Sequence, residues 1–309
     1  MNIYHDIDQL PHFNNAVITI GTFDGVHKGH LQIIKQLVEE AKSINGTPVL
    51  ITFYPHPKQI VGSGKNPLYI INTLTEKAAL LSKAGIEHLV VVPFNKEFAN
   101  QPATEYISNF LVRCFKPHTI IIGYDHRFGK NREGDYHLLE NFAPQFGYIV
   151  KEIPEQLLQN AIISSTKIRE SLLSGDVTTA NNFLGYQYFF SGIVIEGNKL
   201  GRTIGYPTAN LFIEDENKLT PSNGVYAVEV VVEDMQDTFK GMMNIGIRPT
   251  VGGTKRVVEV NIFDFDEMIY GKKVTVQIVA KFRDEAKFNG LDELKKQLAQ
   301  DKIEALSVF

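Results

Sequence analysis

The sequence predicts two domains of different classes, an α/β domain followed by a small antiparallel β-barrel with one late helix. Its 309 residues suffice for two domains, since one domain usually takes about 100–200 residues. The first half alternates apolar runs that have little polar interruption with helical stretches, which is typical of a doubly wound parallel sheet. The second half carries short strand-like runs punctuated by glycine and proline, which favours an antiparallel barrel.

The composition is that of an ordinary globular protein, with 43% hydrophobic and 21% charged residues. The net charge of −4 provides no basic surface, which argues against a nucleic-acid partner. The N-terminus lacks the layout of a signal peptide, and no apolar run approaches the roughly 20 residues that span a bilayer. We therefore expect a cytoplasmic protein without membrane attachment, and the sequence leaves its oligomeric state open.

Four apolar runs rich in valine and isoleucine predict the strands of the α/β domain, because a strand buried on both faces shows no polar alternation. These runs cover residues 17–20, 49–53, 89–94 and 119–123. Helical periodicity between them predicts helices at residues 31–37, 75–84 and 104–115. The second of these helices begins at Thr75, a capping residue type, and stops at Gly85.

Five further runs predict the strands of the barrel, and a late helix closes it. The strands are expected at residues 192–196, 225–232, 239–247, 257–263 and 274–282, and the helix at residues 291–299. The pattern changes within residues 175–192, so we place the boundary at about residue 185. The expected domains are therefore residues 1–185 and residues 186–309.

The first apolar run leads directly into the stretch GTFDGVHKGH, residues 21–30. Gly21 and Gly25 allow a sharp turn and a close approach to a ligand. The helix that follows offers unpaired N–H groups and a positive dipole end to an anion. His27 and His30 are three residues apart and share one face of the first turn, where each can donate a hydrogen bond to phosphate. Two surface histidines are the alternative, but the whole arrangement favours a polyphosphate site.

A second candidate phosphate site is the stretch ISSTKIRE, residues 163–170. Its serine and threonine residues supply hydroxyls and amides where a helix begins, and Arg169 lies on the same helix face as Thr166. An arginine there can bind phosphate through two hydrogen bonds. For the hydroxyl residues alone, an ordinary helix cap is the alternative. The helix is expected to end at Gly175.

Two loops follow apolar strands and therefore lie at the sheet edge where α/β proteins bind ligands. They are FYPHP, residues 53–57, and GYDHRFGKNREGD, residues 123–135. A structured loop without a ligand is the alternative for each.

In the second half, the stretch GNKLGRTIGYPTANL, residues 197–211, has glycines four residues apart. Their amides can fold over a phosphate. Thr208 and Asn210 face the same way on an extended chain and offer hard oxygen atoms to Mg²⁺. Alternation within residues 257–262 places Val258, Val260 and Ile262 on one face and Glu259 with Asn261 on the other. Glu259 is therefore either a general base or a solvated strand carboxylate.

These stretches resemble known signatures. His27-Lys28-Gly29-His30 resembles the HxGH signature of the nucleotidyltransferase superfamily, and residues 163–170 resemble its second phosphate-binding motif. Pro207-Thr208-Ala209-Asn210 resembles the PTAN signature of riboflavin kinases. The kinase resemblance extends over residues 244–253, 257–266, 269–272 and 282–301. Together the two halves resemble the bacterial FAD synthetase family, which joins a Rossmann-like nucleotidyltransferase domain to a β-barrel riboflavin kinase domain.

The resemblance implies an enzyme that phosphorylates riboflavin to FMN with ATP and then adenylylates FMN to FAD with a second ATP, releasing pyrophosphate. Mg²⁺ is the implied cofactor of both reactions, and FMN and FAD are product or substrate rather than a fixed cofactor. The implied partners are riboflavin, FMN and ATP. A monofunctional enzyme with one decayed module and a non-catalytic flavin or nucleotide sensor are the alternatives.

The same resemblance implies four groups of site residues. ATP and phosphate binding for adenylyl transfer falls to Gly21, Phe23, Asp24, Gly25, His27, His30, Asp125, Ser164, Ser165, Thr166 and Arg169. Flavin binding for that reaction falls to His56, Pro57, Asp125 and Phe128. ATP binding by the kinase falls to Gly197, Lys199, Gly201, Gly205, Pro207, Thr208 and Asn210, of which Thr208 and Asn210 also hold the metal. The catalytic residues are Glu259, His27, His30 and Arg169.

Two positions depart from the pattern common in this family. Tyr186 stands where an arginine is common, and Asn261 stands where a histidine is frequent. Neither departure removes a residue assigned to the chemistry, although Tyr186 leaves the contact between the domains open.

Overall fold

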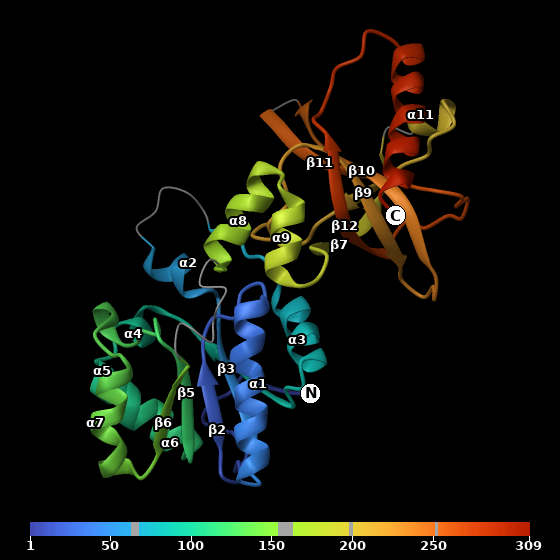
Figure 1. The fold of residues 1–309 in the computed structure, drawn as a ribbon. Coiled ribbons are helices and arrows are strands. Elements are labelled where there is room, and N and C mark those ends of the chain that lie inside the picture. Colours follow the sequence, from blue (N-terminus) through green and yellow to red (C-terminus); the bar gives the residue numbers. More distant parts are fainter. Residues whose placement is uncertain (63–67, 154–162, 198–199, 251–252) are drawn as a thin grey trace. The chain divides into compact units, whose positions relative to one another are not determined.

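The computed structural model describes residues 1–309 except 63–67, 154–162, 198–199 and 251–252 (Figure 1). The chain forms two compact units, Met1–Ser165 and Thr166–Phe309. This division falls earlier than residue 185, because helix α9 (Val177–Leu184) packs on strand β12 (Lys273–Arg283) of the barrel. The side chain of Asn181 on α9 donates to the Ile278 carbonyl and accepts from the Tyr188 amide.

The first unit contains a six-stranded sheet in the order β1-β4-β3-β2-β5-β6, with every neighbouring pair parallel. Its strands are β1 (Asn2–Tyr4), β2 (Val17–Ile20), β3 (Pro48–Tyr54), β4 (His88–Pro93), β5 (Thr119–Gly123) and β6 (Ile149–Ile153). The four predicted strands are confirmed. The two edge strands, β1 and β6, were not predicted, because each exposes most of its residues and lacks a continuous apolar run.

Helices cover both faces of this sheet (Figure 1). The helical elements of the unit are α1 (Lys28–Ser43), α2 (Pro57–Val61), α3 (Leu74–Lys83), α4 (Lys96–Ala99), α5 (Ala103–Glu105), η1 (Tyr106–Val112), α6 (Arg113–Phe115), η2 (Lys130–Arg132) and α7 (Tyr136–Phe146). One core cluster joins α1 and α3 to Val17 and Leu50, and the other joins η1, α6 and α7 to Ile18 and Ile51. Successive strand residues thus enter opposite cores, which confirms the doubly wound prediction.

Two predicted helices differ in detail from the structure. Helix α3 begins at Leu74, because Thr73 rather than Thr75 is its N-cap and forms a capping box with Glu76. The helix predicted at residues 104–115 is a composite of α5, η1 and α6, in which η1 is a π-helix. Its Ile107, Phe110 and Leu111 are buried, as the helical spacing predicted.

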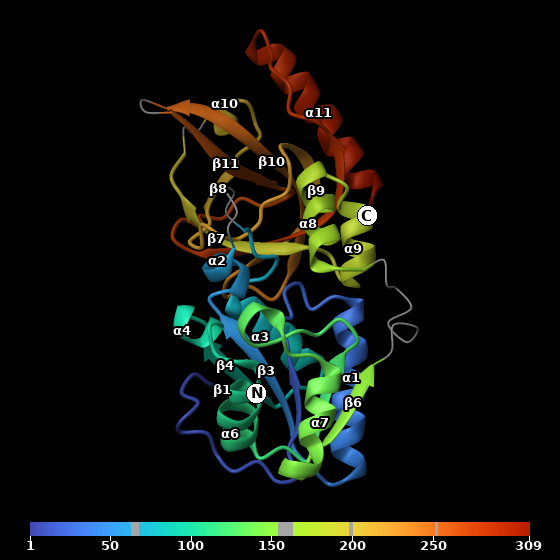
Figure 2. The ribbon, with the colours of Figure 1, turned by 90° about the vertical axis from the view of Figure 1, so that its left-hand side faces the viewer.

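The second unit is built around a closed antiparallel barrel in the order β10-β11-β8-β7-β12-β9, which confirms the predicted class (Figure 2). Its other strands are β7 (Phe189–Ile195), β8 (Ala209–Phe212), β9 (Gly224–Val232), β10 (Thr238–Thr250) and β11 (Gly253–Ile262). Its other helices are α8 (Ser165–Ser174), α10 (Leu200–Thr203) and α11 (Leu291–Ser307), which contacts β9 and β10. Strand β8 is short and lies within the predicted phosphate-binding stretch, so it was foreseen only as extended chain.

Candidate functional site

The first candidate site lies at the start of α1, where the two histidines stack on each other. Their ring centroids are 3.6 Å apart and their planes differ by 16°. His27 is the N-cap of α1, and its Nδ1 accepts a hydrogen bond from the His30 amide at 3.3 Å. The predicted sharing of one face is therefore confirmed. His27 itself is buried, with 6% of its surface exposed.

Burial sets the protonation of His30. Desolvation, followed by the positive charges of His27 and Lys77, lowers the pKa of His30 well below its usual range. Among the described residues, the buried Nδ1 of His30 has no hydrogen-bond partner. A neutral imidazole with an unsatisfied buried nitrogen fits a ligand that brings its own hydrogen-bonding groups.

Residues 21–25 form a loop beside these histidines, and it is fixed from the side of α3. Asp24 is 1% exposed, and its carboxylate accepts hydrogen bonds from the Ile71 amide at 3.0 and 3.2 Å and from the Asn72 amide at 3.2 Å. The Ser165 hydroxyl donates to the Asp24 carbonyl at 2.8 Å. Ser165 belongs to the second predicted phosphate motif and is the last residue of this unit. It thus contacts the first motif. The Asp24 carboxylate itself orders the loop.

The second motif spans the division between the units. Helix α8 begins at Ser165 and is followed by Gly175 at a φ of +88°, so the predicted helix and its end are confirmed. Ser164 and Ser165 belong to the first unit, while Thr166 and Arg169 belong to the second. The side chain of Arg169 is largely buried, with 8% of the residue exposed. Its convergence with the histidines stays a prediction.

The residues predicted to bind flavin in the first unit have clear local contacts. His56 is the N-cap of α2, with its Nδ1 accepting from the Lys58 amide at 3.1 Å, and Pro57 is the first residue of that helix. Phe128 is buried in the core and stacks on Tyr106 at 4.9 Å. Asp125 is exposed after the end of β5. His56 and Phe128 therefore support the fold, and contact with a flavin stays a prediction.

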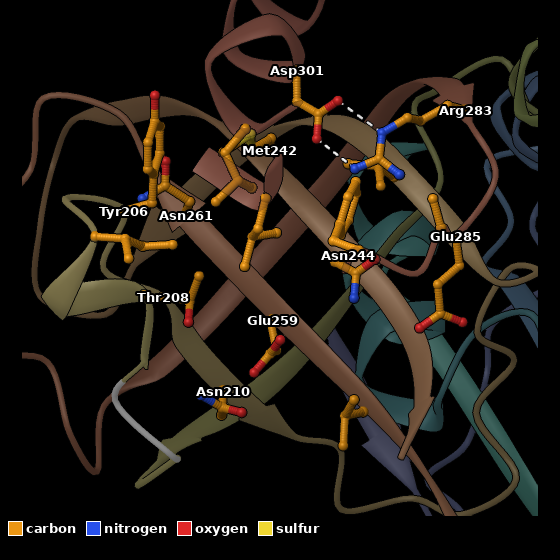
Figure 3. A pocket seen from close by; sticks show the side chains of 18 of the residues that line it. Tyr206, Thr208, Asn210, Met242, Asn244, Glu259, Asn261, Arg283, Glu285 and Asp301 are labelled. Carbon is orange, nitrogen blue, oxygen red and sulfur yellow. Dashed lines mark hydrogen bonds and ion pairs between the residues drawn. The ribbon is translucent and has the colours of Figure 1, made fainter. Parts of the chain in front are cut away.

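The second candidate site is a cavity of about 290 Å³ in the barrel (Figure 3). Strand pairing places Asn244 opposite Glu259 and Glu259 opposite Asn210, on three adjacent strands. Directly opposed residues point to the same face of a sheet, about 5 Å apart at Cβ. All three side chains line the cavity, together with Thr208 and Asn261. The predicted base and the predicted metal ligands are thus brought together.

Two polar contacts hold this group in place. Arg248 Nη2 lies 2.6 Å from Glu259 Oε1, and the Glu259 side chain is only 15% exposed. Asn261 Nδ2 donates to the Pro207 carbonyl at 2.6 Å. Asn261, the departure from the family pattern, therefore anchors the segment that carries Thr208 and Asn210.

The glycines that precede this segment are required for different reasons. A Cβ on Gly197 would lie 2.2 Å from Asn210 Nδ2, and a Cβ on Gly201 would lie 2.1 Å from the Tyr206 carbonyl oxygen. Gly205 has open space but a φ of +86°, which a side chain rarely tolerates. Lys199, also predicted to bind ATP, lies outside the described residues.

The far side of the cavity carries residues that the sequence did not single out. Arg283 forms a bidentate pair with Asp301 of α11 at 2.7 and 2.5 Å (Figure 3). Gln297 donates to the same carboxylate at 2.8 Å. The apolar lining of the cavity includes Tyr206, Met242, Phe288, Leu294 and Leu298. Arg283 and Asp301 lie near the two ends of residues 282–301, which resemble the kinase family, yet no local pattern joins them.

The oxygen atoms of Thr208 and Asn210 are the donor types that Mg²⁺ prefers. The close approach of Gly197 to the Asn210 amide leaves that side chain little room to turn away. Within the described part of the chain, no group of three or more His, Cys, Asp or Glu side chains could hold a metal. The hydroxyl and amide oxygens of Thr208 and Asn210 fit an ion bound through few protein ligands, with water and substrate phosphate completing its shell.

Comparison with known proteins also gives two domains, and the second match begins at residue 184, later than the second compact unit. Residues 10–167 match the FAD synthetase family model, and residues 184–309 match the riboflavin kinase model. The bifunctional riboflavin kinase/FMN adenylyltransferase of Escherichia coli strain K12 is 36% identical over 305 residues, covering 99% of this chain and 96% of the relative. Its namesake in Haemophilus influenzae is 38% identical over 294 residues, covering 95% of this chain and 94% of the relative.

A solved structure is also similar over the full length. The crystal structure described as a macrolide-efflux protein from Streptococcus pneumoniae matches with a TM-score of 0.87 at 31% identity, covering 98% of both chains. Across the described residues of the present chain, no helix has both the length and the apolar character to cross a bilayer.

Proposed function

Because the chain belongs to the family of bifunctional riboflavin kinase/FMN adenylyltransferases, we propose that each of its two sites carries one of the two reactions. The chain is an enzyme of flavin-nucleotide biosynthesis. It transfers the γ-phosphoryl group of ATP to riboflavin, forming FMN and ADP. It then transfers the adenylyl group of a second ATP to FMN, forming FAD and pyrophosphate.

We assign riboflavin phosphorylation to the barrel cavity. Glu259 removes the proton of the riboflavin primary alcohol as the alcohol oxygen attacks the γ-phosphorus of ATP. The bond between the γ-phosphorus and the β–γ bridging oxygen breaks, and ADP leaves. Asn210 and Thr208 would hold Mg²⁺, which neutralises phosphate charge when bound. The apolar side of the cavity suits the flavin ring. The support is the alignment of Asn244, Glu259 and Asn210 across neighbouring strands.

We assign adenylyl transfer to the histidine site. The attacking FMN phosphate is already ionised, so no strong base is needed, and the task is to position ATP and neutralise charge on the pyrophosphate that leaves. His27 and His30 donate hydrogen bonds to phosphate oxygens, and helix α1 presents its amides there. Arg169, Ser164, Ser165 and Thr166 add donors from the second motif. The support is the histidine stack together with the Ser165 contact to Asp24.

The cellular setting follows the same reasoning. We propose that the enzyme works in the cytoplasm with riboflavin, FMN and ATP as its partners, and without nucleic acid or membrane. The net charge of −4 argues against a nucleic-acid partner. Mg²⁺ is the proposed cofactor of both reactions.

The test is an assay of the two reactions in variants of the whole chain. Purified protein incubated with riboflavin, ATP and Mg²⁺ should form FMN and then FAD. Glu259→Gln should abolish FMN formation and leave FAD formation from supplied FMN intact. His30→Ala should do the reverse. Loss of both activities in either variant would contradict independent sites, and flavin binding without turnover in the wild type would favour the sensor alternative.

A further inference from the structure

Lys77 is a buried cation that neither predicted phosphate motif contains. It lies on α3 and exposes 6% of its surface. Its Nζ donates to the Thr22 carbonyl at 2.7 Å and to Thr52 Oγ1 at 3.4 Å. Within the described chain it forms no ion pair within 4 Å. An ammonium buried without a direct counter-charge is costly to the fold, so its presence calls for a reason beyond packing.

The group that Lys77 holds is the loop of residues 21–25. Phe23 within this loop has a φ of +46°, and Val26 just after it has a φ of +37°. Residues other than glycine rarely adopt this left-handed backbone conformation, and it persists only where surrounding contacts impose it. Asp24 secures the loop through the amides of Ile71 and Asn72. Lys77 and the Thr52 hydroxyl secure it through the Thr22 carbonyl, which accepts from Thr52 Oγ1 at 3.1 Å.

Lys77 also provides the positive charge that His30 lacks. Burial, partly offset by Asp24, lowers the pKa of Lys77 to about 8, which leaves the ammonium protonated at neutral pH. Its charge is one of the causes that lower the pKa of His30. The neutral imidazole can donate a hydrogen bond but brings no charge, whereas Lys77 brings a cation to the Thr22 carbonyl of the loop.

We propose that Lys77 is a positioning residue for adenylyl transfer, which holds the loop of residues 21–25 in its ATP-binding conformation and presents a positive charge to the triphosphate. This inference rests on the proposed assignment of FMN adenylylation to the histidine site. It adds a residue from α3 to a site whose other proposed groups come from α1 and the second motif.

The experiment compares Lys77→Met, Lys77→Arg and Lys83→Met in the whole chain. Lys77→Met keeps the apolar stem and removes the charge, Lys77→Arg keeps the charge, and Lys83 is an exposed lysine in the last turn of the same helix. The readouts are kcat and the KM values for ATP and FMN in FAD formation, the rate of FMN formation from riboflavin, and the melting temperature.

We expect Lys77→Met to lower kcat/KM for ATP in FAD formation by roughly 10- to 100-fold, the usual effect of losing a charged hydrogen bond. The KM for FMN and the rate of FMN formation should stay within about twofold. Lys77→Arg should retain most of the activity, and Lys83→Met all of it.

Two results would overturn the inference. One is a Lys77→Met enzyme that forms FAD within about threefold of the wild type. The other is an equal loss in Lys77→Arg and Lys77→Met accompanied by lower melting temperatures, which is the signature of a purely structural lysine. Should Lys77→Met fail to fold, Lys77→Gln replaces it under the same criteria. A wild-type protein that makes no FAD from FMN and ATP would instead refute the proposed function.

Discussion

The buried pair of Arg283 and Asp301 gives the sharpest test of what stabilises the barrel unit. The Asp301 side chain is fully buried and the Arg283 side chain is 20% exposed. Arg283→Met removes both of the hydrogen bonds that Arg283 donates to Asp301 and, among the described residues, leaves the carboxylate with Gln297 as its remaining side-chain donor. Leaving one partner of a buried pair uncompensated costs about 3–5 kcal/mol. For a unit of this size, that loss lowers the melting temperature by roughly 10 °C.

Calorimetry of the whole chain measures this shift, and heat inactivation of FMN formation identifies which transition belongs to the barrel. FAD formation from supplied FMN should survive at temperatures where Arg283→Met has lost FMN formation. The matched control is Lys302→Met, at the residue that follows Asp301 in α11. The pair of Lys302 with Asp264 is exposed and should contribute at most about 1 kcal/mol to the free energy of unfolding. The double variant Arg283→Met/Asp301→Leu should be more stable than Arg283→Met, because it buries no unpaired charge. An Arg283→Met protein whose free energy of unfolding lies within about 1 kcal/mol of the wild-type value would refute the reasoning.

Three further predictions follow from single contacts. Gly197→Ala should raise the KM for ATP in FMN formation about tenfold, because the new methyl group displaces the Asn210 side chain. Gly290→Ala, whose methyl group meets open space, should leave this KM unchanged. Equal KM values in the two variants would contradict this reading. Arg248→Met should lower the rate of FMN formation about tenfold by releasing the Glu259 carboxylate, with FAD formation from FMN unchanged; an unaltered rate would show that the ion pair is incidental. Burial, aided by the charge of Arg132, lowers the pKa of His126 from 6.5 to about 4, so the unfolded chain binds a proton first as the pH falls below 6.5. Urea unfolding should show that the wild type loses about 2 kcal/mol of its free energy of unfolding between pH 7 and pH 5 and that His126→Phe loses less. Identical losses in the two proteins would exclude His126 as the cause.

The sequence alone determined the two classes of fold, because the central elements repeat a local pattern. Strands β2, β3, β4 and β5 are buried on both faces and appear as unbroken apolar runs. The edge strands β1 and β6 are half exposed, so their residues resemble loop segments until pairing with β4 and β5 is seen. Strand β8 was hidden because a binding segment and a short strand share the same extended backbone.

The site was predictable where a motif is contiguous and only there. The stacking of His27 on His30 and the shared face of Glu259 and Asn261 follow from spacing along one element. Lys77, Arg248 and the pair of Arg283 with Asp301 do not, since their partners lie 55, 11 and 18 residues away along the chain. The sequence does not show whether a charged side chain is surrounded by water or by the polar groups of the protein. Tertiary packing decides which charges are buried, and burial gives Lys77, Arg283 and Asp301 their energetic weight. Arg248, whose side chain is 40% exposed, acts through its pair with the largely buried Glu259 carboxylate.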